Sequence, residues 1–427
     1  MRVLFVAAPF ASHLYVQVPI AWALRTAGHE VRVAGSPGLQ GAIAGTGLTP
    51  VPIGEEVDLR SQLSLAEAEL SVQSRDPRRP RGVQRDYGGD DPAAELASSI
   101  AGCRWLFTPD SAFTDVVELA RAWRPDLVVW DTFNYAGAVA AEVTGAASAR
   151  ILFGADGHAQ LRSACRARSA GWPGEGADPL REWLGPVLSG HGAGFTERTV
   201  LGDWTIFPMP SWIWRPGGVQ YVPVRHLPYH GTAPVPGWLS EPPERPRVCV
   251  TMGLSHRENN IGIEAPATDL FDAVADLDVE VIATLDARQI ERVSRHPDNV
   301  RVAGFVPLEA LLPTCSAIVH SGGAGTFAAA VRHAVPQLIV PNCYFAEKWW
   351  GPISMANGVE EQGAGRYVGD ADQMTADGLR KDLRAVLEEP SFADNARRLS
   401  VGLEAMPTPN DLVPVLEALT TQHRRPG

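Results

Sequence analysis

The chain has 427 residues, of which 45% are hydrophobic and 20% are charged, and its formal net charge is -12. This length predicts two domains of about 200 residues each, and the composition excludes a disordered chain. The negative charge argues against nucleic-acid binding, which requires a basic surface. The absence of any run of 18 apolar residues argues against a membrane span.

Strands and helices are predicted to alternate along the first half of the chain. The predicted strands cover residues 2–8, 30–34, 49–53, 126–130 and 148–153, and the predicted helices cover 16–26, 114–123 and 135–144. Strands with nearly continuous apolar sequence are buried on both faces in parallel sheets. The alternation therefore predicts a doubly wound α/β sheet. The pattern is weaker from about Gln62 to Phe107, a segment rich in charge and proline.

A proline-rich segment from Pro208 to Pro246 separates the two halves. Such a density of proline cannot continue a helix or a central strand and predicts a linker. A second alternating set follows, and a final amphipathic helix is predicted near the carboxyl terminus. We expect a first domain at 1–225, a linker at 226–246, a second domain at 247–407, and a helix within 408–427 that packs back on the first domain.

The loop after the first strand is a candidate ligand site, because ligands bind beyond the carboxyl ends of parallel strands. Its segment 9–15 contains His13 but no glycine. A dinucleotide site would need G-x-G-x-x-G there, so an NAD or FAD oxidoreductase is a poor interpretation. By position alone, a single histidine is more often structural than catalytic.

A glycine-rich loop follows a strand of the second half. Its glycines and polar residues are Gly322, Gly323, Gly325, His320 and Thr326. Glycines allow successive N–H groups to point at an anion, and the helix that follows adds the partial positive charge of its N-terminus. The turn from Gly253 to Ser255 follows another strand at the same edge. The two turns predict a diphosphate site, while the lack of G-x-x-x-x-G-K excludes an NTPase loop.

No metal site is expected. The D-x-D pattern Asp276–Asp278 precedes a strand and so lies at the wrong end of the sheet for a ligand, and the pattern Asp370–Asp372 lies in a polar loop. The five cysteines are odd in number and contain no C-x-x-C pair. This predicts reduced thiols in a cytoplasm rather than disulfides or a zinc site.

Several motifs together resemble the donor signature of GT-B family 1 glycosyltransferases. They are Gly304–Pro307, Leu311–Pro313, His320–Thr326 and Val335–Gln337. More narrowly, the chain resembles actinobacterial enzymes that decorate macrolides and anthracyclines, and Arg257–Asn259 points to the desosaminyl and mycaminosyl transferases. The likeness covers most of the chain. It implies two Rossmann-like domains facing a cleft, the first binding the acceptor and the second the nucleotide-sugar donor.

The resemblance also implies roles for individual residues. His13 matches the general base, and Asp131 matches the acid that orients it. The residues that match pyrophosphate contacts are Ser255, His320, Gly323, Gly325 and Thr326. Phe305 and Val306 match the segment that holds the pyrimidine base. The family's sugar-binding Asp is replaced here by Glu347, and Asn357 falls at the position of the expected amide, beyond a segment 342–352 that is longer than usual.

The implied function is inverting transfer of a deoxysugar from a (d)TDP-sugar to a hydroxyl of a lipophilic polyketide aglycone, without a metal or cofactor. One alternative is a nucleotide-sugar epimerase of the same fold, which would need a pair of acidic residues for elimination. The other is a non-catalytic nucleotide-sugar-binding partner protein, favoured by the segment 342–352 but not by the retention of His13 and Asp131.

The resemblance also implies a protein partner, an auxiliary activator that is related to cytochrome P450 but lacks haem. The segment from Gln62 to Phe107 is a candidate site for ordering by such a partner, because binding can supply burial that the chain alone lacks. An ordinary acceptor loop explains this segment equally well. A homodimer is left open.

Overall fold

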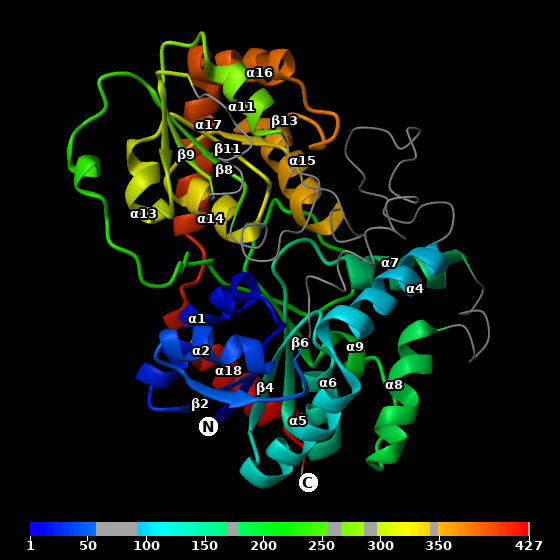
Figure 1. Ribbon diagram of the computed structural model, residues 1–427. Coiled ribbons are helices and arrows are strands. Elements are labelled where there is room, and N and C mark those ends of the chain that lie inside the picture. The colour runs from blue at the N-terminus through cyan, green and yellow to red at the C-terminus, as the bar shows by residue number, and fades with distance from the viewer. Residues whose placement is uncertain (57–91, 169–177, 254–265, 286–296, 342–348, 426–427) are drawn as a thin grey trace.

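The computed structural model describes residues 1–56, 92–168, 178–253, 266–285, 297–341 and 349–425. It has two lobes, each built around one parallel sheet (Figure 1). Both termini lie in the lobe of the first sheet. No helix of the described residues is long and apolar enough to cross a membrane.

The first sheet, as far as the described residues show it, has seven parallel strands in the order β3-β2-β1-β4-β5-β6-β7. They are β1 (Arg2–Val6), β2 (Glu30–Gly35), β3 (Thr49–Pro52), β4 (Leu127–Asp131), β5 (Ala147–Ile151), β6 (Trp204–Phe207) and β7 (Tyr221–Pro223). Every residue of β4, β5 and β6 is buried, which shows that these central strands are covered on both faces. In β5 this includes Arg150, which is paired with the buried Asp156. The order reverses between β1 and β4.

The second sheet has six parallel strands within the described residues, in the order β10-β9-β8-β11-β12-β13. They are β8 (Arg247–Thr251), β9 (Glu280–Thr284), β10 (Val300–Ala303), β11 (Ala317–His320), β12 (Gln337–Ile339) and β13 (Gly365–Tyr367). Both sheets thus have the Rossmann strand order, extended by one strand in the first. Here the order reverses between β8 and β11. The predicted pair of doubly wound domains is confirmed.

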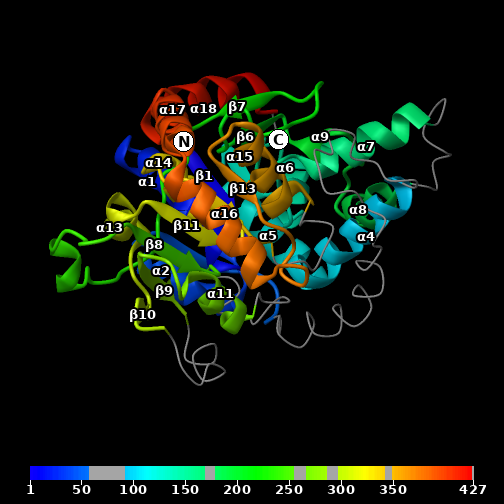
Figure 2. The same ribbon diagram turned by 90° about the horizontal axis from the view of Figure 1, so that it is seen from above.

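Helices cover both faces of each sheet (Figures 1 and 2). They are α1 (Ala11–Thr26), α2 (Gln40–Gly45), α4 (Pro92–Gly102), α5 (Asp110–Trp123), α6 (Ala136–Thr144), α7 (Gly157–Arg168), α8 (Pro179–Gly190), α9 (Arg198–Leu201), α11 (Ala267–Val274), α13 (Leu308–Leu311), α14 (Ala324–Arg332), α15 (Ser354–Glu361), α16 (Ala376–Glu388), α17 (Pro390–Glu404) and α18 (Pro409–His423). On the first sheet, α1 and α18 pack on the face that carries Val3 and Phe5. The opposite face packs against α5 and α6.

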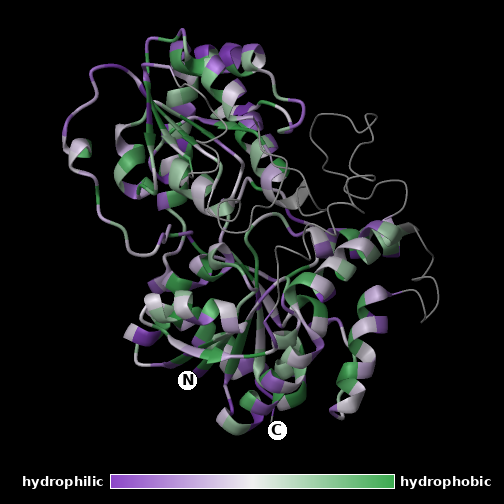
Figure 3. Cartoon of the chain, in the orientation of Figure 1, coloured by the Kyte–Doolittle hydropathy of each residue, from purple (hydrophilic) through white to green (hydrophobic). Residues whose placement is uncertain are grey.

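Buried apolar side chains form the core between these layers, and hydrophilic residues concentrate on the outer helices and loops (Figure 3). One buried cluster joins the two lobes. It contains Met209 and Ile213, which follow β6 of the first sheet, together with Phe327 of α14 and Met355 of α15. The carboxyl-terminal helix also connects the lobes. It follows the helices of the second lobe in the chain, and it packs against α1 of the first lobe.

Several predicted boundaries differ from the structure. The proline-rich segment is not all linker, because Tyr221–Pro223 forms β7. This strand lies at the edge of the sheet, where a proline that lacks an N–H breaks no ladder. The first helix begins at Ala11, five residues before the predicted Val16. Its first turn includes Ser12 and His13, and these polar residues interrupt the apolar periodicity on which the prediction depended.

Candidate functional site

The candidate residues of each lobe lie where the strand order of its sheet reverses. His13 follows β1, and Asp131 is the last residue of the neighbouring β4. In the second sheet, Gly253 follows β8, and the loop that begins at His320 follows the neighbouring β11. Ligands of doubly wound sheets bind at this switch point, beyond the carboxyl ends of the strands. The two lobes therefore each present one candidate site.

His13 and Asp131 are 118 residues apart in the sequence and form a hydrogen-bonded pair. The distance from His13 Nδ1 to Asp131 Oδ2 is 2.9 Å. The other carboxylate oxygen accepts a 3.0 Å hydrogen bond from the backbone N–H of Phe133. The side chains are 13% and 3% exposed. When Nδ1 carries the proton and donates it to the carboxylate, Nε2 is unprotonated and can accept a proton from a ligand.

Aromatic rings surround the imidazole of His13. The ring centroid of Phe153 lies 4.3 Å from that of His13, and those of Phe133 and Phe10 lie at 5.5 and 5.7 Å. Phe107 stacks on Phe133 at 4.9 Å. Sequence analysis missed these residues. A signal was present, because Phe133 and Phe153 each follow a strand by two residues and therefore reach the edge at which ligands bind.

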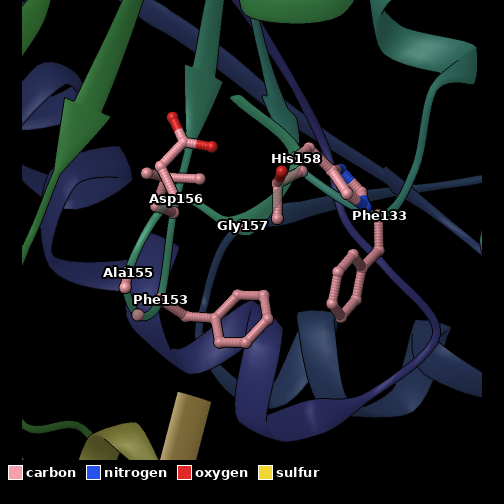
Figure 4. Close-up of a pocket in the computed structure, with 9 residues that line it drawn as sticks. Phe133, Phe153, Ala155, Asp156, Gly157 and His158 are labelled. Carbon is pink, nitrogen blue, oxygen red and sulfur yellow. The ribbon is translucent and has the colours of Figure 1, made fainter. Parts of the chain in front are cut away.

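A hollow of about 220 Å³, open solvent included, lies beside these rings. Phe133 and Phe153 line it together with the segment from Gly154 to His158. Figure 4 shows both phenyl rings on one side of this segment and the Asp156 carboxylate directed away from them. The hollow is thus lined mostly by apolar atoms, and two of its lining residues, Phe133 and Phe153, pack against the His13 ring.

The glycine-rich loop of the second lobe ends in the N-terminus of α14. Gly323 is the N-cap of this helix, and no side chain caps it. The N–H groups of the first helical turn have no acceptor within the helix and carry its partial positive charge. Gly323 and Gly325 are exposed and Thr326 is half-buried. The start of α14 therefore combines exposed backbone donors with one hydroxyl, a combination that can bind an anion.

His320 is buried, and both of its ring nitrogens have partners within the protein. Nδ1 accepts the N–H of Gly322 at 3.1 Å, so the proton is on Nε2, which donates to Gln337 Oε1 at 2.9 Å. Burial lowers the pKa of His320 to about 4, against the opposing effect of the Gln337 hydrogen bond. The imidazole is therefore neutral and shapes the loop. A contact between His320 or the Gly322 N–H and a diphosphate would have to replace one of these bonds.

Three buried histidines give an expected pH dependence of stability. Burial lowers the pKa of His158, His226 and His320 from 6.5 to about 4. The unfolded chain takes up these protons below about pH 6.5, and the folded chain does so only near pH 4. The neutral histidines therefore make their full contribution to the free energy of unfolding above pH 6.5. This contribution falls as the pH drops from 6.5 to 4, by about 1.4 kcal/mol per pH unit for each histidine.

Urea unfolding at pH 7.5, 6 and 5 measures this dependence. We expect the midpoint to fall with pH. His226→Leu is the matched control, because neither ring nitrogen of His226 has a hydrogen-bond partner among the described residues. This variant should show a shallower dependence than the parent chain. Equal midpoints at pH 7.5 and 5 for the parent would contradict the assignment.

The remaining predicted donor residues lie at several places. Phe305 is 42% exposed, with its ring centroid 6.2 Å from that of His230, and Val306 is buried after β10. Gly253 has φ +86° in the turn after β8, and Ser321 Oγ of the glycine-rich loop donates to the neighbouring Met252 carbonyl at 2.9 Å. Asn357 is half-buried on α15.

Two predicted site residues, Ser255 and Glu347, lie outside the described residues. Within the described ranges, no group of three or more His, Cys, Asp or Glu side chains is arranged to hold a metal ion. Gln337 is a residue that sequence analysis placed only in a motif and not in the site. Its contact with His320 depends on the pairing of β11 with β12.

Comparisons with known proteins cover nearly the whole chain. Residues 22–253 match the family model "Erythromycin biosynthesis protein CIII-like, N-terminal domain", and residues 268–419 match the corresponding C-terminal domain. The chain is 44% identical to an aclacinomycin-T 2-deoxy-L-fucose transferase of Streptomyces galilaeus, over 100% of this chain and 97% of the relative. It is 43% identical to a 10-deoxymethynolide desosaminyltransferase of Streptomyces venezuelae, over 100% and 99%.

Solved structures agree with these sequence matches. The structure of the glycosyltransferase VinC in complex with DTDP superposes with a TM-score of 0.84 at 38% identity, covering 99% of this chain and 100% of that chain. The spinosyn forosaminyltransferase SpnP gives a TM-score of 0.80 at 38% identity, with 99% of each chain covered. The expected fold and the expected branch of enzymes are both confirmed.

Proposed function

Because the chain belongs to the erythromycin biosynthesis protein CIII-like family of glycosyltransferases, we propose that it transfers a deoxysugar from a (d)TDP-sugar to a hydroxyl of a polyketide aglycone. The observation that carries this proposal is the His13–Asp131 pair, whose imidazole packs against Phe133 and Phe153, two residues that line the apolar hollow. Relatives named for the transfer of deoxysugars to anthracycline and macrolide compounds support the two substrate classes, and a relative solved with DTDP supports the nucleotide.

The proposed mechanism begins with activation of the acceptor. A hydroxyl is a weak nucleophile until a base takes its proton in the transition state. His13 Nε2 is the base in this scheme. Asp131 holds the proton on Nδ1 and stabilises the imidazolium that forms, since its carboxylate lies 2.9 Å from that nitrogen. The activated oxygen attacks the anomeric carbon of the sugar directly.

The second half of the mechanism concerns the leaving group. The bond from the anomeric carbon to the diphosphate breaks as the new glycosidic bond forms, and the departing TDP gains negative charge. The free N–H groups at the start of α14 and the Thr326 hydroxyl stabilise this charge. Direct displacement on the side opposite to the leaving group inverts the anomeric configuration. The scheme requires no metal.

We also propose a division of labour between the lobes. Residues 1–225 bind the acceptor, 226–246 link the lobes, 247–407 bind the donor, and 408–427 return to the first lobe. Each sheet falls wholly within one of these segments. The packing of α18 against α1 supports the last assignment. A hydrogen bond from the Arg225 N–H to the Pro407 carbonyl, 2.6 Å long, ties the first boundary to the last.

Acceptor-dependent release of TDP tests the proposed function. The first pair of substrates to assay is a TDP-activated 2-deoxy-L-fucose with aclacinomycin T, the compounds for which the 44% identical relative is named, followed by a panel of macrolactones and anthracyclinones. We expect release of TDP only when an acceptor is present, with a glycosylated product of inverted configuration. Donor binding without turnover on any acceptor would favour the non-catalytic binding partner, and conversion of the TDP-sugar without an acceptor would favour the epimerase.

We further propose that a second protein, related to cytochrome P450 but without haem, activates this enzyme. The support is the likeness to the desosaminyl and mycaminosyl transferases. Part of the candidate segment, 62–91, lies outside the described residues, and its remainder forms α4 and the π-helix at Cys103–Phe107. The measurement is the transfer rate of the purified chain with and without the auxiliary protein. Full turnover of the chain alone, unchanged on addition, would contradict the proposal.

A further inference from the structure

A buried histidine links α4 to the wall of the apolar hollow. His158 is the second residue of α7 and lines the hollow. Its Nε2 lies 3.0 Å from the Ser99 hydroxyl of α4, and its Nδ1 lies 3.1 Å from the hydroxyl of Tyr135. All three residues are at most 3% exposed. The segment from Gly154 to His158 forms one wall of the hollow. The imidazole thus connects this wall to two other parts of the fold, α4 and Tyr135.

The chemistry of this cluster makes it a support and not a second base. Burial lowers the pKa of His158 to about 4 and raises the pKa of Tyr135. The ring is therefore neutral, and the phenol keeps its proton. A neutral imidazole has one donor and one acceptor nitrogen. Nδ1 faces the Tyr135 hydroxyl, and Nε2 faces the Ser99 hydroxyl and, at 4.0 Å, the Cys103 thiol. Because a buried polar group without its partner costs free energy, the three side chains hold one another in place.

The same wall is fixed from the other side by Asp156. Its carboxylate forms a two-pronged ion pair with Arg150 of β5 and accepts a 2.8 Å hydrogen bond from Tyr221 of β7. It also accepts the backbone N–H of Ala159 at 3.1 Å, which caps α7. The sheet therefore holds the wall at Asp156. The His158 end of the wall has no such partner on a strand and instead depends on Tyr135 and on Ser99 of the helix α4.

We propose that Ser99 and Tyr135 are positioning residues of the acceptor pocket, because they hold His158 and its wall in the place that the aglycone requires. Since Ser99 belongs to α4, the affinity for the acceptor then depends on the packing of α4 against this wall. This inference rests on the proposed function in one respect, that the hollow beside His13 takes the aglycone. Phe133 connects the two features, because its ring centroid lies 5.5 Å from that of His13 and 6.0 Å from that of His158.

The test is the affinity of the full chain for acceptor and for TDP, measured separately. Aclacinomycin T is titrated by the fluorescence of its anthracycline chromophore, and TDP by calorimetry. The variants are Ser99→Ala and Tyr135→Phe, each of which removes one hydroxyl. We expect each to raise the Kd for aclacinomycin T by about tenfold, the scale of one buried hydrogen bond, with the Kd for TDP changed by less than about twofold.

Ile100→Val is the matched control. Ile100 neighbours Ser99 on α4, is 3% exposed and lies in the core of the first lobe, so this variant loses about 0.5–1.5 kcal/mol of stability without losing a polar contact. It should leave the acceptor Kd unchanged while lowering Tm. If the three variants lose stability alike and keep the parent affinity for aclacinomycin T, the hydroxyls are merely structural and the inference is overturned.

The proposed function fails in a different way. A parent chain that binds TDP but neither aclacinomycin T nor any macrolactone or anthracyclinone of the panel would remove the acceptor assignment of the hollow, and the inference with it. A parent chain that binds the acceptor, with Ser99→Ala and Tyr135→Phe equal to it, removes only the inference. Selective loss of acceptor affinity in both variants, with Ile100→Val unchanged, supports it.

Discussion

Replacement of His13 by alanine is expected to lower kcat by a factor of about 10² to 10⁴, the usual contribution of a general base. The His13 imidazole packs against the rings of Phe133 and Phe153, and because its Nδ1 is bound to Asp131, Nε2 is the nitrogen left to take the acceptor proton. The measurement is steady-state TDP release with a fixed acceptor. The Kd for TDP should not change, because the donor loop belongs to the other lobe.

Two further variants show whether the loss is specific to the pair. His191→Ala makes the same substitution at the end of α8, on a different part of the first lobe, and should keep the parent rate. Asp131→Asn keeps the shape of the side chain but no longer stabilises an imidazolium, so it should also lower kcat, and the double variant should lose little more than His13→Ala alone. A parent-like kcat in His13→Ala would remove His13 from the mechanism.

A single added methyl group at Gly322 is expected to distort the donor loop. Gly322 has φ +84°, a conformation that costs an alanine about 1 kcal/mol or more. A Cβ at this position would lie 2.8 Å from Pro352 Cβ and 2.9 Å from Pro352 Cα, so the backbone itself has to move. The hydrogen bond from Gly322 N–H to His320 would move with it. We expect Gly322→Ala to lower Tm by several degrees and to weaken TDP binding at least tenfold.

The neighbouring glycine provides the matched control. Gly323 has φ -65°, and a Cβ there would have no atom of the described structure within 4 Å. Gly323→Ala should therefore keep the parent Tm, whatever its effect on the ligand. Thermal unfolding of both variants, with and without TDP, makes the comparison. A Gly322→Ala protein as stable as Gly323→Ala, with parent affinity for TDP, would show that the loop does not depend on this conformation.

Much of the architecture could be predicted because it depends on local sequence. Runs of apolar residues such as those of β1 and β4 specify strands that are buried on both faces, and their alternation with helices specifies the doubly wound fold. The glycine-rich loop could also be predicted, since it combines a strand, glycines and a helix start within a few residues. Prediction failed at the edges of elements. Val16 marks the start of the apolar periodicity, but α1 begins at Ala11.

The sequence by itself therefore determined the two sheets, the loops at their carboxyl ends and the family. The tertiary structure decided which distant groups meet. It paired His13 with Asp131, placed Phe133 and Phe153 around the imidazole, and gave both nitrogens of His320 to protein partners. Except for the local bond between Gly322 and His320, these contacts depend on strand order and on the packing of helices, which join residues far apart in the chain. The family resemblance implied the His13–Asp131 pair, but its geometry is decided by the pairing of β1 with β4.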